Sequence, residues 1–297
     1  MTQLSNAQEA AVEAALAKLD LVAKVAILSG QDFWTLPAMP QAGLASMVMS
    51  DGPVGVRGTT WAAEDPSIAL PSPTALAATW DTGLARLAGR LLGQEARRKG
   101  VHVVLAPTVN LQRSPLGGRH FEAFSEDPLL TAQIGAGYVA GVQDQGVAAT
   151  VKHFVGNDAE TQRFTVSVQV TEQVLRELYL VPFETIVREA SAWAVMSAYN
   201  SVNGTTMTEH EPLQLGVLKR EWAFDGCIVS DWLAARDAVG TASGGLDIAM
   251  PSLRSPWGDR LVAAVRDGLV PADTIDEQAR RVLRLAARVG ALAGAPE

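Results

Sequence analysis

Short apolar segments recur along the chain at intervals of about 35–45 residues, and most are separated by amphipathic helical patterns. This alternation predicts a parallel sheet covered by helices, because strands that are buried on both faces are apolar throughout. The repeat length favours a closed (β/α)8-like TIM barrel over an open doubly wound α/β sheet. No glycine-rich phosphate-binding turn follows the first strand, which weighs against a nucleotide-binding fold.

Seven segments have the predicted strand pattern and are mostly apolar on both faces. They cover residues 46–50, 75–80, 101–106, 147–152, 194–197, 227–229 and 246–250. No convincing eighth strand is found, so the barrel is expected to be irregular, with fewer than eight regular strands. Residues 1–290 are assigned to this barrel and its N-terminal helices, and the Ala/Gly-rich tail 291–297 to the start of a linker.

Helical spacing of apolar residues predicts the elements between the strands. The predicted helices cover residues 6–20, 20–29, 81–99, 128–145, 171–190 (capped by Thr171) and 212–222. A last helix is expected to start with a capping box from Thr274 to Glu277. Its apolar face contains Ile275, Val282, Leu283 and Leu285. In the helix over 81–99, the inward residues are expected to be Leu84, Leu87, Leu91 and Leu92, and the tryptophans assigned to the core are Trp80, Trp193 and Trp222.

Composition excludes several classes of protein. Hydrophobic residues make up 48% of the 297 positions, enough for a large core, and charged residues make up 19%, which gives no sign of disorder. The net charge of −8 argues against a nucleic-acid-binding protein, which needs a basic face. No apolar run approaches the roughly 18–20 residues that cross a membrane, and residues 1–9 lack the pattern of a secretory signal. We expect a cytoplasmic protein, with an extracellular location left open.

The predicted strand over 227–229 ends at Ser230, Asp231 and Trp232. In a parallel barrel the strand ends carry the chemistry, because the loops that follow them converge on one open face. A carboxylate followed by an indole suits a sugar, since the charged oxygen can attack a ring carbon while the indole covers the flat apolar face. The alternative is a strand-end turn in which Asp231 caps a helix. Cys227, the single cysteine, is expected in the core.

Polar side chains also follow other predicted strands, namely Asp51, the Lys152–His153 pair and Tyr199. Two polar segments, 110–122 and 157–163, add guanidinium and carboxylate groups. In the first, Gly117 and Gly118 permit a tight turn that would swing Arg119 over the barrel mouth, and the alternative is a salt-bridged surface loop. No histidine–carboxylate cluster has metal-ligand spacing, so neither a metal nor another cofactor is expected.

Five segments, taken in order, resemble the signatures of glycoside hydrolase family 3, the β-glucosidases. They are 49–57 (MSDGPVGVR), 110–122 continuing through 124–128, 151–154 (VKHF), 195–200 (VMSAYN) and 229–232 (VSDW). Any one of these segments would be weak support, but five in the same order are specific. The similarity runs from about residue 20 to 290, and it implies the N-terminal catalytic barrel domain of this family.

The resemblance implies a retaining glycoside hydrolase that releases β-D-glucosyl residues from the non-reducing end of β-glucosides. Asp231 matches the catalytic nucleophile, which forms a covalent glycosyl-enzyme at the anomeric carbon. The positions that match substrate-binding residues are Asp51, Arg57, Arg119, Lys152, His153, Arg163, Tyr199 and Trp232. These roles are physically reasonable, because nearby cations keep a nucleophilic carboxylate ionised and charged donors bind hydroxyl groups strongly.

A retaining hydrolase also needs a second carboxyl group, which protonates the departing oxygen. In the β-glucosidase branch the resemblance places this glutamate on a following α/β sandwich domain, which is absent from these 297 residues. In the single-domain β-N-acetylglucosaminidase branch an Asp–His pair follows the Lys–His pair, but segment 155–163 contains no histidine and Arg163 matches the β-glucosidase pattern. We therefore expect the barrel of a two-domain β-glucosidase, with little activity on its own.

Several alternatives remain. Within the family they are a β-N-acetylglucosaminidase, a β-xylosidase and a macrolide β-glucosidase, and outside it a Schiff-base lyase that uses Lys152 or a non-catalytic sugar-binding barrel. The expected partners are a β-glucoside or oligosaccharide and the missing sandwich domain, with no nucleic acid and no membrane. A homo-oligomer is compatible with the sequence, which does not specify the aglycone.

Overall fold

The computed structural model describes residues 4–60 and 62–296, and Glu297, the last residue of the predicted linker, lies outside them. The chain divides into two compact units, which are described one at a time. Among the described residues, the first unit contains 49–60 and 62–207, and the second contains 4–48 and 208–296. Among the described helices, none combines the length and the apolar character needed to cross a membrane.

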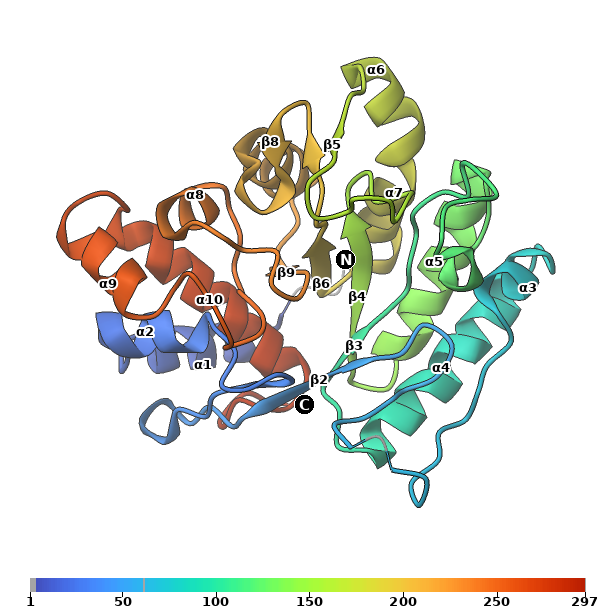
Figure 1. Ribbon diagram of the computed structural model, residues 1–297. Coiled ribbons are helices and arrows are strands. Elements are labelled where there is room, and N and C mark those ends of the chain that lie inside the picture. The colour runs from blue at the N-terminus through green and yellow to red at the C-terminus, as the bar shows by residue number, and fades with distance from the viewer. Residues whose placement is uncertain (1–3, 61, 297) are drawn as a thin grey trace. The chain divides into compact units, whose positions relative to one another are not determined.

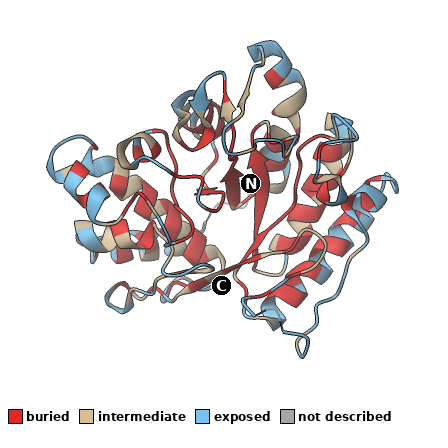
Figure 2. Ribbon diagram, in the orientation of Figure 1, coloured by how far each residue is buried: buried red, intermediate tan, exposed pale blue. Residues whose placement is uncertain are grey.

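The first unit contains parallel strands whose order is β2-β3-β4-β6 (Figure 1). Their bounds are β2 (Met47–Asp51), β3 (Val103–Leu105), β4 (Ala148–Phe154) and β6 (Ala194–Ser197). Met49 pairs with Val103, and Val103 with Ala148, which fixes the register of β2, β3 and β4. Every residue of β3, β4 and β6 is buried (Figure 2), as expected for strands with helices against them. Four of the predicted strands are thereby confirmed.

Helices and a small second sheet complete the first unit. They are α3 (Pro73–Ala77), α4 (Thr82–Arg98), η2 (His120–Glu122), α5 (Pro128–Gln143), α6 (Glu172–Val174), η3 (Leu175–Tyr179) and α7 (Val181–Ala190), with β5 (Ser167–Val168), β7 (Ser201–Val202) and β8 (Thr205–Thr206). Thr171 caps α6 as predicted, since its side chain accepts a hydrogen bond from Val174 N at 3.3 Å. The helix predicted over 171–190 is interrupted by the π-helical segment η3, because Pro182 has no N–H and crowds the preceding turn.

The strand predicted over 75–80 is wrong, because this segment begins with the helix α3. Ser72 caps that helix by accepting a hydrogen bond from Ala75 N at 3.2 Å, and Pro73 occupies a first-turn position that needs no N–H donor. Trp80 follows in a left-handed conformation, with φ of 56°, and is 76% exposed. Its assignment to the core is therefore also wrong; Trp193 is half-buried, and Trp222 is buried as predicted.

The helix α4 forms where predicted, but its buried face differs from the predicted one. Leu92 is buried, whereas Leu84, Leu87 and Leu91 are 46%, 52% and 39% exposed. Apart from Leu92 and Glu95, the residues that α4 buries are small: Ala85, Ala88, Gly89, Gly93 and Ala96. They meet α5, where glycines also lie, and a Cβ atom added at Gly137 would stand only 2.6 Å from Thr82 O. The two helices approach so closely that the large leucines cannot lie between them.

The second unit contains the N-terminal helices and the elements that follow residue 208. They are α1 (Asn6–Leu16), α2 (Leu21–Ile27), β1 (Thr35–Leu36), η1 (Pro40–Ala42), η4 (Met207–Glu209), η5 (Pro212–Glu221), β9 (Cys227–Ser230), α8 (Ala238–Ser243), α9 (Asp259–Arg266) and α10 (Ala272–Arg288). The strand β9 is buried along its whole length, Cys227 included, as predicted. The strand predicted over 246–250 is only partly confirmed, because Ile248 and Ala249 form isolated parallel bridges, to Val229 and Ser29.

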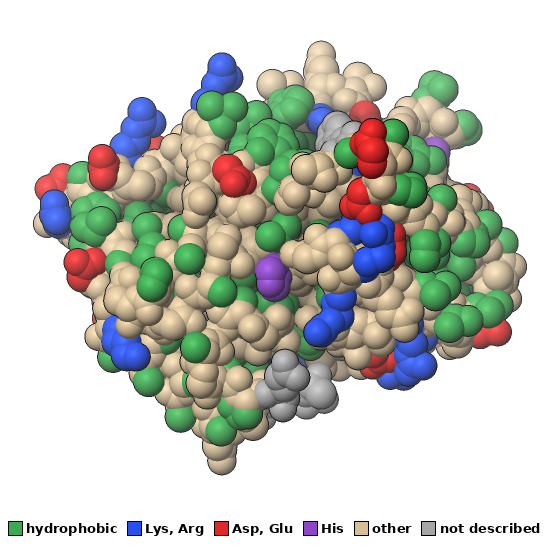
Figure 3. Space-filling view, turned by 90° about the horizontal axis from the view of Figure 1, so that it is seen from below, with side chains coloured by type: hydrophobic (Ala, Val, Ile, Leu, Met, Phe, Trp, Pro, Cys, Tyr) green, Lys and Arg blue, Asp and Glu red, His purple; other side chains and the backbone are tan. Residues whose placement is uncertain are grey.

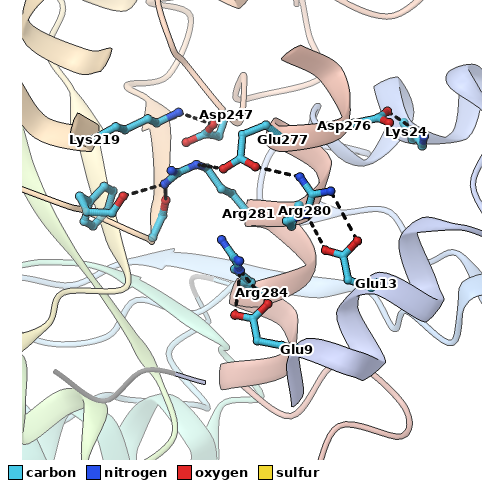
Figure 4. A network of polar contacts seen from close by, with 12 residues as sticks. Glu9, Glu13, Lys24, Lys219, Asp247, Asp276, Glu277, Arg280, Arg281 and Arg284 are labelled. Carbon is cyan, nitrogen blue, oxygen red and sulfur yellow. Dashed lines mark hydrogen bonds and ion pairs between the residues drawn. The ribbon is translucent and has the colours of Figure 1, made fainter. Parts of the chain in front are cut away.

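The helix α10 is held against α1 and α2 by ion pairs (Figure 4). Its predicted apolar face is buried, but the predicted capping box is wrong, because Pro271 occupies the N-cap position and Thr274 lies within the first turn. The carboxylate of Glu277 instead binds Arg280 at 2.8 Å and Arg281 at 2.9 Å. Arg280 also binds Glu13. This ion pair joins α10 to α1 within the second unit.

The segment after α10 packs onto the second unit. Ala291 and Leu292 are buried, Ala45 N donates to Ala291 O at 2.9 Å, and Ala293 N donates to Gly43 O at 2.9 Å. The assignment of 291–297 to a linker stays a prediction, although its first residues pack as part of this unit. On the face shown in Figure 3, Lys and Arg side chains lie among Asp and Glu side chains rather than in one field of a single sign.

Candidate active site

A row of alternating charges lies in the first unit, where β2 ends at Asp51 and β4 carries Lys152. The Lys152 Nζ atom is 3.5 Å from Asp51 Oδ1 and 3.9 Å from Glu122 Oε2. On one side Arg57 extends the row, with its Nη1 atom 3.8 Å from Asp51 Oδ2. On the other side Arg119 Nε donates to Glu122 Oε1 at 2.5 Å.

Glu160 connects this row to one more guanidinium. Its Oε1 atom is 3.7 Å from Arg119 Nη1, and its Oε2 atom accepts a hydrogen bond from Arg163 Nη1 at 2.7 Å. We call these seven residues the charge row: Arg57, Asp51, Lys152, Glu122, Arg119, Glu160 and Arg163. Because opposite signs alternate throughout, each charge between the two terminal arginines has an opposite charge on either side, which offsets the cost of removing it from water.

Five members of the charge row were predicted to bind substrate, and the structure brings these five together. Lys152 is almost fully buried, so its ammonium group depends on the two carboxylates for compensation. Arg57 is the most exposed member, at 55% of its side chain. Beside it lies a surface hollow of about 330 Å³, whose other lining residues are Thr60, Ala62, Asp65, Pro66 and Ser67.

His153 is buried behind the charge row. Its Nδ1 atom lies 2.9 Å from Asn110 Oδ1, which also accepts a hydrogen bond from His153 N at 2.9 Å. Asn110 Nδ2 in turn donates to His153 O at 3.0 Å, so a single side chain fixes both the backbone and the ring. Burial lowers the pKa of His153 well below its usual value, and the charges of Arg119, Lys152 and Arg163 lower it further. The imidazole is therefore neutral at pH 7.

Tyr199 follows β6 and lies under the end of the charge row. Its ring is 4.5 Å from the ring of Phe164, and the guanidinium carbon of Arg163 stands 4.7 Å above its centroid. Arg163 also contacts the Phe164 ring, at 5.0 Å. These cation–π contacts, together with Glu160, hold the Arg163 guanidinium from two directions.

The tight turn predicted at Gly117 and Gly118 is present. Gly118 has a φ of 94°, which favours glycine, and a Cβ atom there would lie 3.0 Å from Glu160 Cγ. A backbone hydrogen bond from Glu160 N to Gly117 O, at 3.1 Å, joins the loop over 110–122 to the loop over 155–163. The turn therefore brings Arg119 to Glu160 by letting the two loops touch.

Asp158 joins the same two loops from the inside. Its Oδ1 atom accepts a hydrogen bond from Leu111 N at 2.6 Å. Burial raises the pKa of Asp158 to about 6, although the Leu111 bond and the charges of Arg113 and His120 act in the opposite direction. A cavity of about 10 Å³ lies beside it, with room for about one water molecule. Asn157 also lines this cavity, and its Oδ1 atom has no hydrogen-bond partner among the described residues.

The second unit contains the remaining two predicted site residues. Asp231 follows β9 directly and is 8% exposed, and its Oδ1 atom accepts a hydrogen bond from Trp232 N at 2.7 Å. Ser230 fixes the strand end, because its Oγ atom accepts from Met250 N at 2.9 Å. The alternative in which Asp231 caps a helix is wrong, since α8 begins at Ala238 with Asp237 as its N-cap.

Trp232 belongs to an aromatic cluster in the second unit. Its ring centroid is 5.4 Å from that of Trp34 and 6.4 Å from that of Phe33, and its Nε1 atom donates to Phe33 O at 2.8 Å. An indole that is anchored in this way offers a rigid apolar surface at low entropic cost. Phe33 is about half exposed, which extends the apolar surface toward solvent.

Sequence reasoning gave no role to several residues that organise the site: Asn110, Glu122, Glu160, Phe33 and Trp34. The pairs Arg119–Glu122 and Glu160–Arg163 have a signal in the sequence, because opposite charges three residues apart lie on one side of a helical turn. The contacts of Asn110 with His153 and of Trp34 with Trp232 are long-range and leave no local pattern. Within residues 4–60 and 62–296, no group of three or more His, Cys, Asp or Glu side chains is arranged to hold a metal ion.

Comparison with protein families gives a match to the model described as the glycosyl hydrolase family 3 N terminal domain, over residues 40–285. The chain belongs to this family. A beta-glucosidase of Rhizobium radiobacter is 48% identical over 286 residues, which cover 95% of this chain and 35% of that protein. Beta-glucosidase B of Emericella nidulans is 44% identical over 282 residues, which cover 94% of this chain and 33% of that protein. The chain thus spans about a third of the length of these curated relatives.

Solved structures share the fold of this family 3 domain. A beta-glucosidase from Kluyveromyces marxianus in complex with glucose is 38% identical, with a TM-score of 0.90, over 96% of this chain and 36% of that one. Beta-glucosidase 3B from Thermotoga neapolitana in complex with glucose is 35% identical, with a TM-score of 0.89, over 94% of this chain and 42% of that one. The predicted fold class, an irregular (β/α) barrel, is confirmed.

Proposed function

We propose that the protein is a retaining β-glucosidase in which Asp231 is the nucleophile and the charge row holds the sugar. The observation that carries this proposal is the position of Asp231, a buried carboxylate directly after β9 in a chain of glycosyl hydrolase family 3. Support for the substrate comes from relatives that are named beta-glucosidases and from the solved structures of two other beta-glucosidases in complex with glucose.

In this mechanism a carboxylate oxygen of Asp231 attacks the anomeric carbon as the bond to the leaving oxygen breaks. That oxygen takes a proton from a general acid, and water then hydrolyses the glycosyl-enzyme ester with retention of configuration. Lys152 and the guanidiniums of the charge row would donate hydrogen bonds to sugar hydroxyls, and Asp51 would accept them. Trp232 would cover the apolar face of the sugar ring.

We also propose that the general acid lies outside these 297 residues. The length of the relatives supports this, because about two thirds of each lies beyond the matched segment. The 297-residue chain should then release the leaving groups of activated aryl glucosides, which need no proton, but cleave a disaccharide about 10²–10⁴-fold more slowly than an enzyme with its acid in place. Rapid hydrolysis of cellobiose by this chain alone would contradict the external acid.

The nucleophile is tested by trapping. A 2-deoxy-2-fluoro-β-D-glucoside with a dinitrophenolate leaving group should esterify Asp231, and peptide mass spectrometry should find the added mass on the peptide that contains it. Asp231→Asn should abolish labelling, and the matched variant Asp267→Asn, which changes an exposed residue of the same unit, should label normally. Labelling at another carboxylate would overturn the assignment. Sugar binding without any labelling would favour a non-catalytic barrel, and borohydride trapping of a carbonyl substrate on Lys152 would favour the lyase.

A further inference from the structure

Glu160 stands out in the charge row because it contacts two guanidiniums from different loops, those of Arg119 and Arg163. Its Oε1 atom accepts a hydrogen bond from Asn157 Nδ2 at 2.9 Å and is 3.7 Å from Arg119 Nη1. Its Oε2 atom accepts from Arg163 Nη1 at 2.7 Å. With both carboxylate oxygens engaged by protein donors, Glu160 is better placed to fix these groups than to bind a ligand itself.

The surroundings of Glu160 are built to keep it in this position. Its backbone N donates to Gly117 O. Its Cβ and Cγ atoms would stand only 3.0–3.1 Å from a Cβ atom added at Gly118, so its aliphatic stem packs closely against this glycine. The two partner guanidiniums are each anchored a second time, Arg119 by Glu122 and Arg163 by the Tyr199 ring. Glu160 provides a connection between them, because it contacts both arginines, whereas Glu122 contacts Arg119.

We propose that Glu160 is a positioning residue of the sugar site: it fixes Arg119 relative to Arg163, so that both guanidiniums meet the same sugar in one arrangement. This inference rests on the proposed function. Arg119, Glu160 and Arg163 are each 22–31% exposed, so the two arginines retain donors that a ligand can reach. A pair of donors that is ordered before binding loses less conformational entropy when it binds.

The position of Glu160 predicts a particular pattern among its variants. In Glu160→Gln the side chain keeps its shape but loses its charge, so the link to Arg119 weakens while each arginine keeps its second anchor. We expect the dissociation constant for D-glucose to rise by about 5- to 50-fold, since small displacements of binding groups have effects of this size. Glu160→Asp keeps the charge with a shorter reach, and it should recover part of the lost affinity.

The test is isothermal titration of the 297-residue chain with D-glucose, accompanied by thermal unfolding of each variant. The matched control is Glu184→Gln, which breaks the exposed pair with Arg188 on α7 and should leave glucose affinity unchanged. With an activated aryl glucoside, Glu160→Gln should raise KM more than it lowers kcat, whereas partial unfolding would lower kcat alone by reducing the active fraction.

The outcomes separate this inference from the proposed function. If the wild-type chain binds glucose and Glu160→Gln binds it equally well, the positioning role is wrong while the sugar site stands. The role is also wrong if Glu160→Asp shows the full loss, because charge would then not be the cause. If the wild-type chain binds no glucose and labels no carboxylate, the proposed function fails and this inference fails with it.

Discussion

The buried carboxyl group of Asp158 makes a pH-dependent contribution to stability that can be measured with one substitution. Burial raises its pKa from 3.8 to about 6 in the folded protein. Between these two values the folded protein binds a proton that the unfolded chain has released. The contribution of Asp158 to the free energy of unfolding is therefore fully present below pH 3.8 and is lost as the pH rises through about 6.

The size of this effect follows from the shift. One pKa unit corresponds to about 1.4 kcal/mol, so a shift of about two units amounts to roughly 3 kcal/mol in total. About 2 kcal/mol of this falls between pH 4.5 and pH 7, where most of the folded-state titration takes place. Asp158→Asn removes the titration and retains an oxygen that can accept the hydrogen bond from Leu111 N.

The assay is denaturant unfolding of the wild-type protein and Asp158→Asn at pH 4.5 and pH 7. The quantity compared is the difference in free energy of unfolding between the two proteins at each pH. A pH-independent effect of the introduced amide, and the titration of groups that both proteins share, cancel when this difference is compared between the two pH values. We expect the wild-type protein to lose about 2 kcal/mol relative to the variant as the pH rises to 7. A difference that is the same at both pH values, or one that changes in the opposite direction, would refute the reasoning.

Two further predictions concern packing and burial. Leu92→Ala should lower the free energy of unfolding by about 2–5 kcal/mol, because it empties a buried site on α4. Leu87→Ala, on the exposed side of the same helix, should change it by less than about 0.5 kcal/mol. Denaturant unfolding compares the two variants, and equal losses would contradict the assigned buried face. Lys219→Met should lower the free energy of unfolding by about 3–5 kcal/mol, because it leaves the fully buried Asp247 carboxylate without the ammonium group that stands 2.6 Å away. A variant with the thermal stability of the wild-type protein would show that other groups compensate the charge of Asp247.

The sequence predicted the strands best where all residues of a segment are apolar. The runs that form β3 and the first three residues of β9 are apolar and fully buried, as expected for strands with helices against both faces. The segment over 75–80 forms a helix rather than a strand because Ser72 and Pro73 provide a helix start signal, which outweighs the apolar content of the segment. On α4 the spacing of apolar residues correctly predicts a helix, but which face is buried depends on how closely α5 approaches. No local sequence pattern records that distance.

The candidate site was predictable where residues lie at strand ends and unpredictable where loops meet. Asp51 and Lys152 follow from the rule that strand ends carry chemistry, and they do lie together. The contacts that Glu160 makes with Arg119 and Gly117 join loops that are far apart in sequence. Their geometry depends on the turn at Gly118, whose left-handed conformation a sequence permits but does not require.

The interface between α4 and α5 has a consequence for mutational tolerance. A Cβ atom added at Gly93 would stand 2.9 Å from Val142 O, and one at Gly137 would stand 2.6 Å from Thr82 O, so even alanine would force the backbones apart. The leucines on the outer side of α4 meet solvent and are open to substitution. Along α4 a library of random variants should therefore conserve the glycines together with the buried Leu92, and should accept replacement of the exposed leucines.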